Sequence, residues 1–122
     1  MTPDSPDDRV EGNTLRVLVV DKEYHGDLEA SSRGHMLTGM TAVEDSAGYV
    51  LIERLQGSLR GRTGTFLLQH YGIMDHGATH QLVEVIPDSG TGELRGLAGR
   101  MTGTIVDGAH SYELDYSLPG AT

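Results

Sequence analysis

The sequence predicts an all-β protein, a small closed antiparallel β-barrel of about seven or eight strands. Segments in which apolar and polar residues alternate recur along the chain and are bounded by turn residues, as is typical of strands. The 17 glycines among 122 residues lie between and within these segments, where turns and bulges need them. A glycine interrupts every window with apolar residues at helical spacing, so we expect no helix.

The chain divides into an arm, one domain and a tail. Residues 1–12 are rich in proline and aspartate and lack periodicity, so we expect a flexible acidic arm. Residues 13–118 form a single barrel domain, and residues 119–122 form a C-terminal tail. The expected strands cover residues 15–20, 28–40 (with a glycine break), 49–56, 65–71, 80–86, 100–106 and 111–118.

A two-residue turn at Arg60 and Gly61 sets the register of the first clear hairpin. It pairs Leu55 with Phe66 and Leu51 with His70, and side chains of paired residues point to the same face. The inner face then carries Tyr49, Leu51, Glu53, Leu55, Phe66, Leu68 and His70. One additional loop residue would instead turn Arg54, Gln56 and Gln69 inward.

A second turn, at Asp107 and Gly108, predicts a C-terminal hairpin in the same way. Its apolar face carries Met101, Ile105, His110, Tyr112, Leu114, Tyr116 and Leu118, and its other face is polar. This clean separation into two faces is what a correct register produces.

Glu53 and His70 are the candidate catalytic residues. They are diagonal neighbours on the inner face, and a buried carboxylate is costly unless it is paired. Such a pair raises the pKa of the imidazole and fixes its tautomer, as in an acid–base dyad; the alternative is an ordinary structural hydrogen bond. The candidate ligand-binding residues are Leu51, Leu55, Phe66, Leu68, Gln69, Met101, His110 and Tyr112.

Composition argues against several classes of function. The formal net charge of −9 disfavours nucleic acid, and the absence of cysteine excludes disulfides and thiolate sites. No apolar run is long enough for a membrane helix and no signal peptide is recognisable, so we expect a cytoplasmic protein. The glycine-rich segment 89–99 lacks a phosphate-loop lysine, and no metal-ligand spacing occurs. We therefore expect neither a metal nor a cofactor.

Four strings carry a family resemblance: GDLEASS (26–32), GYVLIERLQGSLRGRTGTFLLQH (48–70), VIPDSGTGELRGLAG (85–99) and DGAHSYELDYSL (107–118). They resemble a family of small bacterial proteins of unknown function whose barrel is similar to that of plant allene oxide cyclase. The resemblance covers roughly residues 10–118 and implies a calycin-type barrel. Allene oxide cyclase closes a ring without a cofactor by shaping a flexible substrate, and related barrels serve as cyclases in bacterial secondary metabolism. No catalytic residue of that enzyme maps onto this chain.

Three functional hypotheses follow. The first is a cofactor-free cyclase or isomerase acting on a hydrophobic unsaturated molecule, in which Glu53 and His70 move a proton. The second is a carrier of an apolar metabolite. The third is a barrel filled by its own side chains that acts through its surface. Apolar residues on the outer face, such as Ile52, Leu67 and Tyr71, suit a homo-oligomer.

Overall fold

The chain forms one nine-stranded antiparallel sheet, which confirms the all-β prediction. The computed structural model describes the backbone of residues 2–106 and 109–119 and the side chains of residues 2–103 and 112–119. The elements are β1 (Thr2–Pro3), β2 (Asp8–Val10), β3 (Asn13–Tyr24), β4 (Leu28–Thr41), β5 (Ala47–Leu59), β6 (Arg62–Asp75), β7 (Ala78–Val85), the 3₁₀ helix η1 (Gly92–Leu94), β8 (Ala98–Val106) and β9 (Ala109–Ser117).

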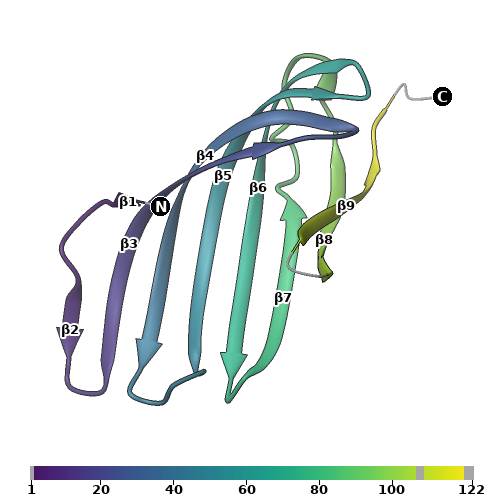
Figure 1. Ribbon diagram of the computed structural model, residues 1–122. Coiled ribbons are helices and arrows are strands. Elements are labelled where there is room, and N and C mark those ends of the chain that lie inside the picture. Colours follow the sequence, from purple (N-terminus) through teal and green to yellow (C-terminus); the bar gives the residue numbers. More distant parts are fainter. Residues whose placement is uncertain (1, 107–108, 120–122) are drawn as a thin grey trace.

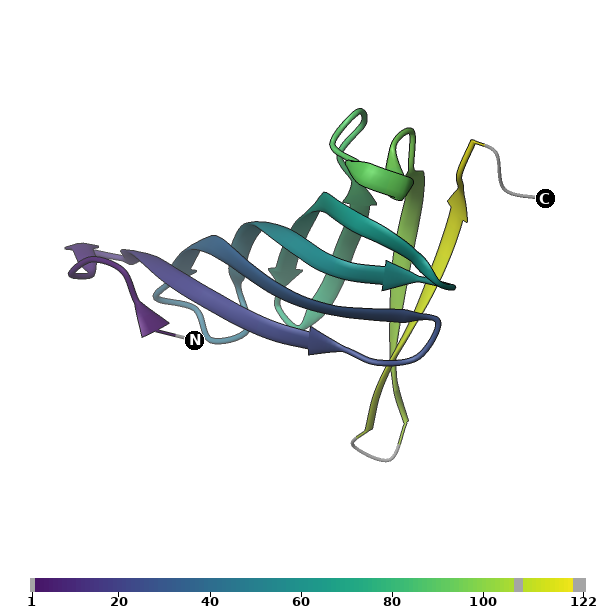
Figure 2. The ribbon, with the colours of Figure 1, turned by 90° about the horizontal axis from the view of Figure 1, so that it is seen from above.

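Neighbours along the chain are neighbours in the sheet, in the order β1-β3-β4-β5-β6-β7-β8-β9, and β2 also pairs with β3. Within the residues that the structure describes, no backbone pairing joins β9 to β3, so the pairings leave the sheet open. Figures 1 and 2 show how strongly it curls, with the β8–β9 hairpin crossing the concave side. No helix in the described part of the chain is long and apolar enough to cross a membrane.

The N-terminal residues, expected to form a flexible arm, contribute two short strands to the sheet. Thr2 pairs with Val19 in β1, and Arg9 pairs with Thr14 in β2. The side chains of both strands are exposed. The expected glycine break in residues 28–40 is also absent, since β4 runs without interruption through Gly34 and Gly39.

The β5–β6 hairpin has the predicted register. Leu59 pairs with Arg62 across a two-residue turn in which Arg60 has φ 48° and Gly61 has φ 84°. Positive φ at both positions is the requirement of a type I′ turn. Leu55 therefore faces Phe66, and the predicted inner face is confirmed.

The β8–β9 hairpin also has the predicted register, with Met101 opposite Leu114 and Val106 opposite Ala109. The turn residues Asp107 and Gly108 lie outside the described residues.

The core lies on the concave side, where the hairpin meets the ends of β3–β6 (Figure 2). It consists of Tyr24, Leu28, Leu55, Leu59, Phe66, Leu68, Val85, Leu94, Leu97, Met101 and Leu118. Aliphatic and aromatic side chains from both ends of the sheet therefore share one core, which holds the sheet in its curled shape.

The connection between β7 and β8 is tied to the first half of β6. Thr91 exchanges backbone and side-chain hydrogen bonds with Thr65, and the Glu93 carboxylate accepts hydrogen bonds from the amide and hydroxyl of Thr63. A Cβ on Gly64 would lie 2.1 Å from the Thr91 carbonyl oxygen, so only glycine permits this close approach. The segment SGTGEL thus continues the sheet beyond β7 and places Leu94 in the core.

Leu94→Ala is expected to destabilise the protein by about 3 kcal/mol because Leu94 is 1% exposed and its loss leaves a cavity. Val10→Ala, at a position 63% exposed, should change stability by less than about 0.5 kcal/mol. Urea unfolding of both variants measures the difference. Equal effects would contradict the role of Leu94 in closing the core.

Candidate functional site

A buried carboxylate forms the centre of the candidate site. Glu53 lies on the inner face of β5 and is 1% exposed, and His70, on the inner face of β6, is 6% exposed. The register places Glu53 opposite Leu68 and His70 opposite Leu51, so Glu53 and His70 are diagonal neighbours as predicted.

Three side chains from two strands bind the Glu53 carboxylate. His70 Nε2 on β6 is hydrogen-bonded to Oε2. Tyr24 Oη on β3 donates to Oε1 at 2.8 Å, and Lys22 Nζ on β3 donates to Oε2 at 3.3 Å. The sequence predicted the contact with His70 but neither of the contacts with β3.

Gly34 makes the contacts with β3 sterically accessible. It is paired with Glu53 on the intervening strand β4, and a Cβ there would lie 2.7 Å from Glu53 Cβ and 2.5 Å from the Ile52 carbonyl oxygen. Without a side chain at this position, Glu53 can extend across β4 toward Tyr24 and Lys22.

The surroundings of Glu53 keep it ionised. Burial acts to raise its pKa, but the hydrogen bond with His70, followed by interactions with Ser32, Lys22 and Tyr24, outweighs burial and lowers the pKa to about 2. For Tyr24, burial and then the negative charge of Glu53 raise the pKa of the phenol above its ordinary value of 10.0. Tyr24 is therefore a neutral donor to a permanently charged carboxylate at neutral pH.

These contacts limit what Glu53 can do chemically. A carboxylate with a pKa of about 2 is a weak base at neutral pH, and its two oxygens already accept three hydrogen bonds. The arrangement is better suited to holding Tyr24 and His70 in fixed positions than to accepting a proton from a substrate.

A cavity of about 660 Å³ opens beside Tyr24, between the β3–β4 turn and the β8–β9 hairpin. The side chains of Leu28, Met101, Tyr112 and Tyr116 contribute to its wall. The rings of Tyr24 and Tyr112 meet edge to face with centroids 5.7 Å apart, which brings β9 against β3 through side chains. Neither Glu53 nor His70 is among the lining residues, so Tyr24 connects the buried carboxylate to the cavity.

The other predicted ligand-binding residues are divided among three locations. Leu51, Leu55, Phe66 and Leu68 are buried on the inner face and do not line this cavity. Gln69 is exposed on the outer face, because it adjoins the inward-facing His70 in β6.

His110 belongs to β9 and pairs with Ile105, but its side chain lies outside the described residues. Tyr24, the cavity-lining residue that is bound to Glu53, was missed by sequence reasoning because it lies two strands from Glu53. Within the described residues, no cluster of three His, Asp or Glu side chains could hold a metal ion.

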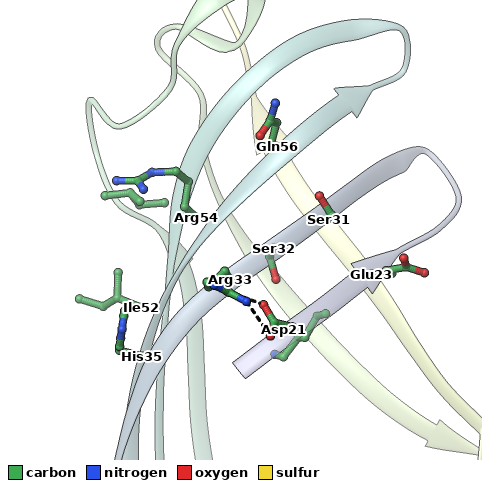
Figure 3. A pocket seen from close by; sticks show the side chains of 11 residues that line it. Asp21, Glu23, Ser31, Ser32, Arg33, His35, Ile52, Arg54 and Gln56 are labelled. Carbon is green, nitrogen blue, oxygen red and sulfur yellow. Dashed lines mark hydrogen bonds and ion pairs between the residues drawn. The ribbon is translucent and has the colours of Figure 1, made fainter. Parts of the chain in front are cut away.

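A second, shallower hollow of about 840 Å³ lies over the outer face of β3–β6. Figure 3 shows Arg33 and Arg54 at its wall, with Arg33 bound to Asp21 by an ion pair of 2.8 Å. Lys22 and Ser32 line it as well.

The lowered pKa of Glu53 makes stability depend on pH. In the unfolded chain the Glu53 carboxyl has a pKa near 4.5, whereas in the folded protein it is protonated only near pH 2. The stabilisation of the fold by the ionised carboxylate is therefore complete above pH 4.5 and is lost as the pH falls toward 2. The loss of the free energy of unfolding between neutral pH and pH 2 that is due to Glu53 is about 3 kcal/mol. Urea unfolding between neutral and acidic pH should show that Glu53→Gln lowers stability at neutral pH and removes this part of the acid dependence.

Glu113→Gln, at an exposed position on β9, serves as the control and should leave the acid dependence of the wild type in place. A stability difference between wild type and Glu53→Gln that stays constant across this pH range would contradict the assignment.

Gly34→Ala tests the route of the Glu53 side chain across β4. The added methyl group collides with Glu53 and with the backbone of β5, so we expect a loss of about 2 kcal/mol or more. Gly39→Ala is the matched control on the same strand, because a Cβ there meets only the Leu15 side chain at 3.8 Å. Similar unfolding free energies for the two variants would show that Gly34 has no special role.

Comparisons with known proteins support one part of the resemblance, membership of a family of unknown function. A family described as "Protein of unknown function (DUF3224)" matches residues 1–116. The crystal structure of a DUF3224 protein of unknown function from Shewanella oneidensis MR-1 is similar over 98% of this chain and 90% of that chain, with 47% sequence identity and a TM-score of 0.91. No curated protein matches the chain. The match over nearly the whole sequence and the shared fold establish that this chain belongs to the DUF3224 family.

Proposed function

We propose that this protein binds a hydrophobic small molecule in the cavity between the β3–β4 turn and the β8–β9 hairpin. The observation that carries the proposal is the cavity itself. Its volume of about 660 Å³ falls in the usual range for small-molecule sites. Its wall combines apolar and aromatic side chains with the phenol of Tyr24, which a buried carboxylate holds in position, and with charged residues that include Glu23, Arg60 and Glu113.

One polar contact available to a ligand is the Tyr24 oxygen. Its proton is donated to Glu53, so the remaining lone pair can accept a hydrogen bond. A ligand would complement this part of the wall if it placed a hydroxyl or amide donor against Tyr24 and an apolar group against Met101 and Tyr116.

We propose further that the sheet closes into an allene oxide cyclase-like barrel around the ligand. The edge-to-face contact of Tyr24 with Tyr112 supports closure, because it already joins the two ends of the sheet. Hydrogen exchange of the β9 amides tests it. Pairing with a strand on each side would protect successive amides, whereas an open edge would leave alternate amides exchanging fast.

Ligand binding is tested by filling the cavity. Leu114→Trp places a large ring at a half-buried position of the wall, and we expect the affinity for a neutral apolar fluorophore such as Nile red to fall at least about tenfold. Asp115→Trp, one residue along on the exposed face, is the matched control and should bind normally. The natural chain has no tryptophan, so the emission of each new residue also reports its burial. Equal affinities would argue against this cavity as the binding site.

Cofactor-free cyclisation or isomerisation is the second candidate function. It is supported by the fixed position of Tyr24, which would hold a flexible substrate in a reactive conformation while Glu53 and His70 act behind it as positioning residues. Such a reaction rearranges bonds within one molecule, so the product has the mass of the substrate.

Incubation with unsaturated fatty-acid epoxides, followed by chromatography and mass spectrometry, tests the catalytic candidate. We expect an isomeric product from the wild type and at least about a tenfold lower rate from Tyr24→Phe, since the phenol oxygen is lost while the ring remains. If that variant retains the wild-type rate, the role of Tyr24 is wrong. Binding without any product would support carriage instead.

A further inference from the structure

The outer face of the sheet carries a continuous apolar surface that the proposed function does not use. Seven of its side chains are between 39% and 46% exposed: Leu15, Leu37, Val50, Ile52, Tyr71, Ile73 and Leu82. They lie on β3–β7, on the side opposite to Glu53. We call these seven residues the outer apolar surface.

Strand register makes this surface continuous. Leu37 pairs with Val50, Val50 with Tyr71, and Tyr71 with Leu82, so four strands contribute one uninterrupted row. Ile52 lies one row above Val50 and Ile73 lies one row below Tyr71. An exposed apolar patch of this extent, in a chain with a net charge of −9, usually marks an interaction site.

The size of the surface suits a small protein–protein interface. The five strands lie about 4.8 Å apart and the surface extends along them for roughly six residues, so it presents on the order of 500 Å². Two such faces packed together would bury on the order of 1,000 Å², which is at the lower limit for a specific interface. The opposing surface must also be apolar, and a second copy offers such a surface because its outer face carries the same seven side chains.

Charged side chains lie beyond both ends of the outer apolar surface. Beyond Ile52, Arg33 and Arg54 line the hollow of Figure 3, and Arg54 has no ion-pair or hydrogen-bond partner among the described residues. Beyond Ile73, the outward-facing Asp75 ends β6, and its carboxylate is hydrogen-bonded to His76 Nδ1 at 2.5 Å.

Glu44 and Asp45 lie in the neighbouring turn, which is hydrogen-bonded to the β6–β7 turn through Gly77 N and the Asp45 carbonyl at 3.0 Å. At the first end Asp21 is paired with Arg33 and the exposed Glu23 also lines the hollow, so Arg54 is the cation available to meet the acidic second end.

We infer that the outer apolar surface is the interface with a second copy of this chain, related by a two-fold axis that runs across the strands. This axis superposes the apolar rows and places the Arg54 end of one copy over the Asp75 end of the other. The contact is isologous, so the same pairing occurs twice. The row from Leu37 to Leu82 contains no charged residue. The two negatively charged copies therefore bring no like charges together along this row.

This interface is independent of the proposed ligand cavity. The cavity lies on the concave side, and the outer apolar surface lies on the other side of the same strands. An experiment that contradicts the proposed interface therefore does not contradict the proposed ligand binding, and the reverse is also true.

Sedimentation equilibrium over a wide range of protein concentrations tests the inference. The wild type should form a reversible dimer, and Val50→Glu should weaken it at least about a hundredfold, because the charge would be buried in both copies. Thr102→Glu, at an exposed position on β8, is the matched control and should dimerise as the wild type does. Leu37→Ser replaces Val50→Glu if circular dichroism shows that the latter does not fold.

Charge reversal tests the orientation. Arg54→Glu should weaken the dimer at least about threefold, and adding Asp75→Arg to the same chain should restore it, because the two positions face each other across the axis. A wild type that stays monomeric at all concentrations, or a dimer that tolerates both Val50→Glu and Leu37→Ser, overturns the interface. A dimer that Asp75→Arg fails to rescue overturns the two-fold arrangement.

Discussion

The ionised carboxylate of Glu53, almost completely removed from water, is the constraint around which the middle of the sheet is organised. An unpaired charge at this depth would lower the free energy of unfolding by several kcal/mol, so the fold must supply hydrogen-bond donors to the carboxylate. His70 on β6 and Tyr24 and Lys22 on β3 do so, and one side chain on β5 thereby links strands on both sides of it. The glycine at position 34 is a consequence of this arrangement, because its missing side chain opens the path to β3.

The same constraint separates positioning from catalysis. Hydrogen bonds strong enough to lower the pKa of Glu53 to about 2 also remove its basicity at neutral pH, so the features that make it tolerable in the core make it a poor proton acceptor. What they provide is a tyrosine of fixed orientation at the wall of a cavity. Pre-organised walls of this kind favour binding and the selection of one ligand conformation.

Local signals in the sequence were sufficient to predict the seven strands β3–β9 and the register of two hairpins. Arg60 and Gly61 fit a type I′ turn, and a two-residue loop at these positions allows only one pairing register for β5 and β6. The proximity of Glu53 and His70 follows from that register. Tyr24 could not be predicted in this way. Its contact with Glu53 spans β4, and its contact with Tyr112 depends on the curl of the whole sheet, which no turn encodes. Pairing of residues 2–10 with β3 was missed because proline and aspartate mask weak edge strands.

Alternation along the strands assigns separate tasks to the two faces of β5 and β6. Glu53 and His70 point to the concave side with the core, whereas the adjacent positions Ile52 and Tyr71 point outward. A sheet that served only to enclose a ligand would be expected to carry polar residues on its outer face, as antiparallel sheets with one solvated face do. The apolar residues found there are better explained by a second buried surface. The assembly of two copies that we propose would cover it while leaving the proposed ligand cavity of each copy accessible, so that oligomerisation and binding would take place on opposite sides of the same strands.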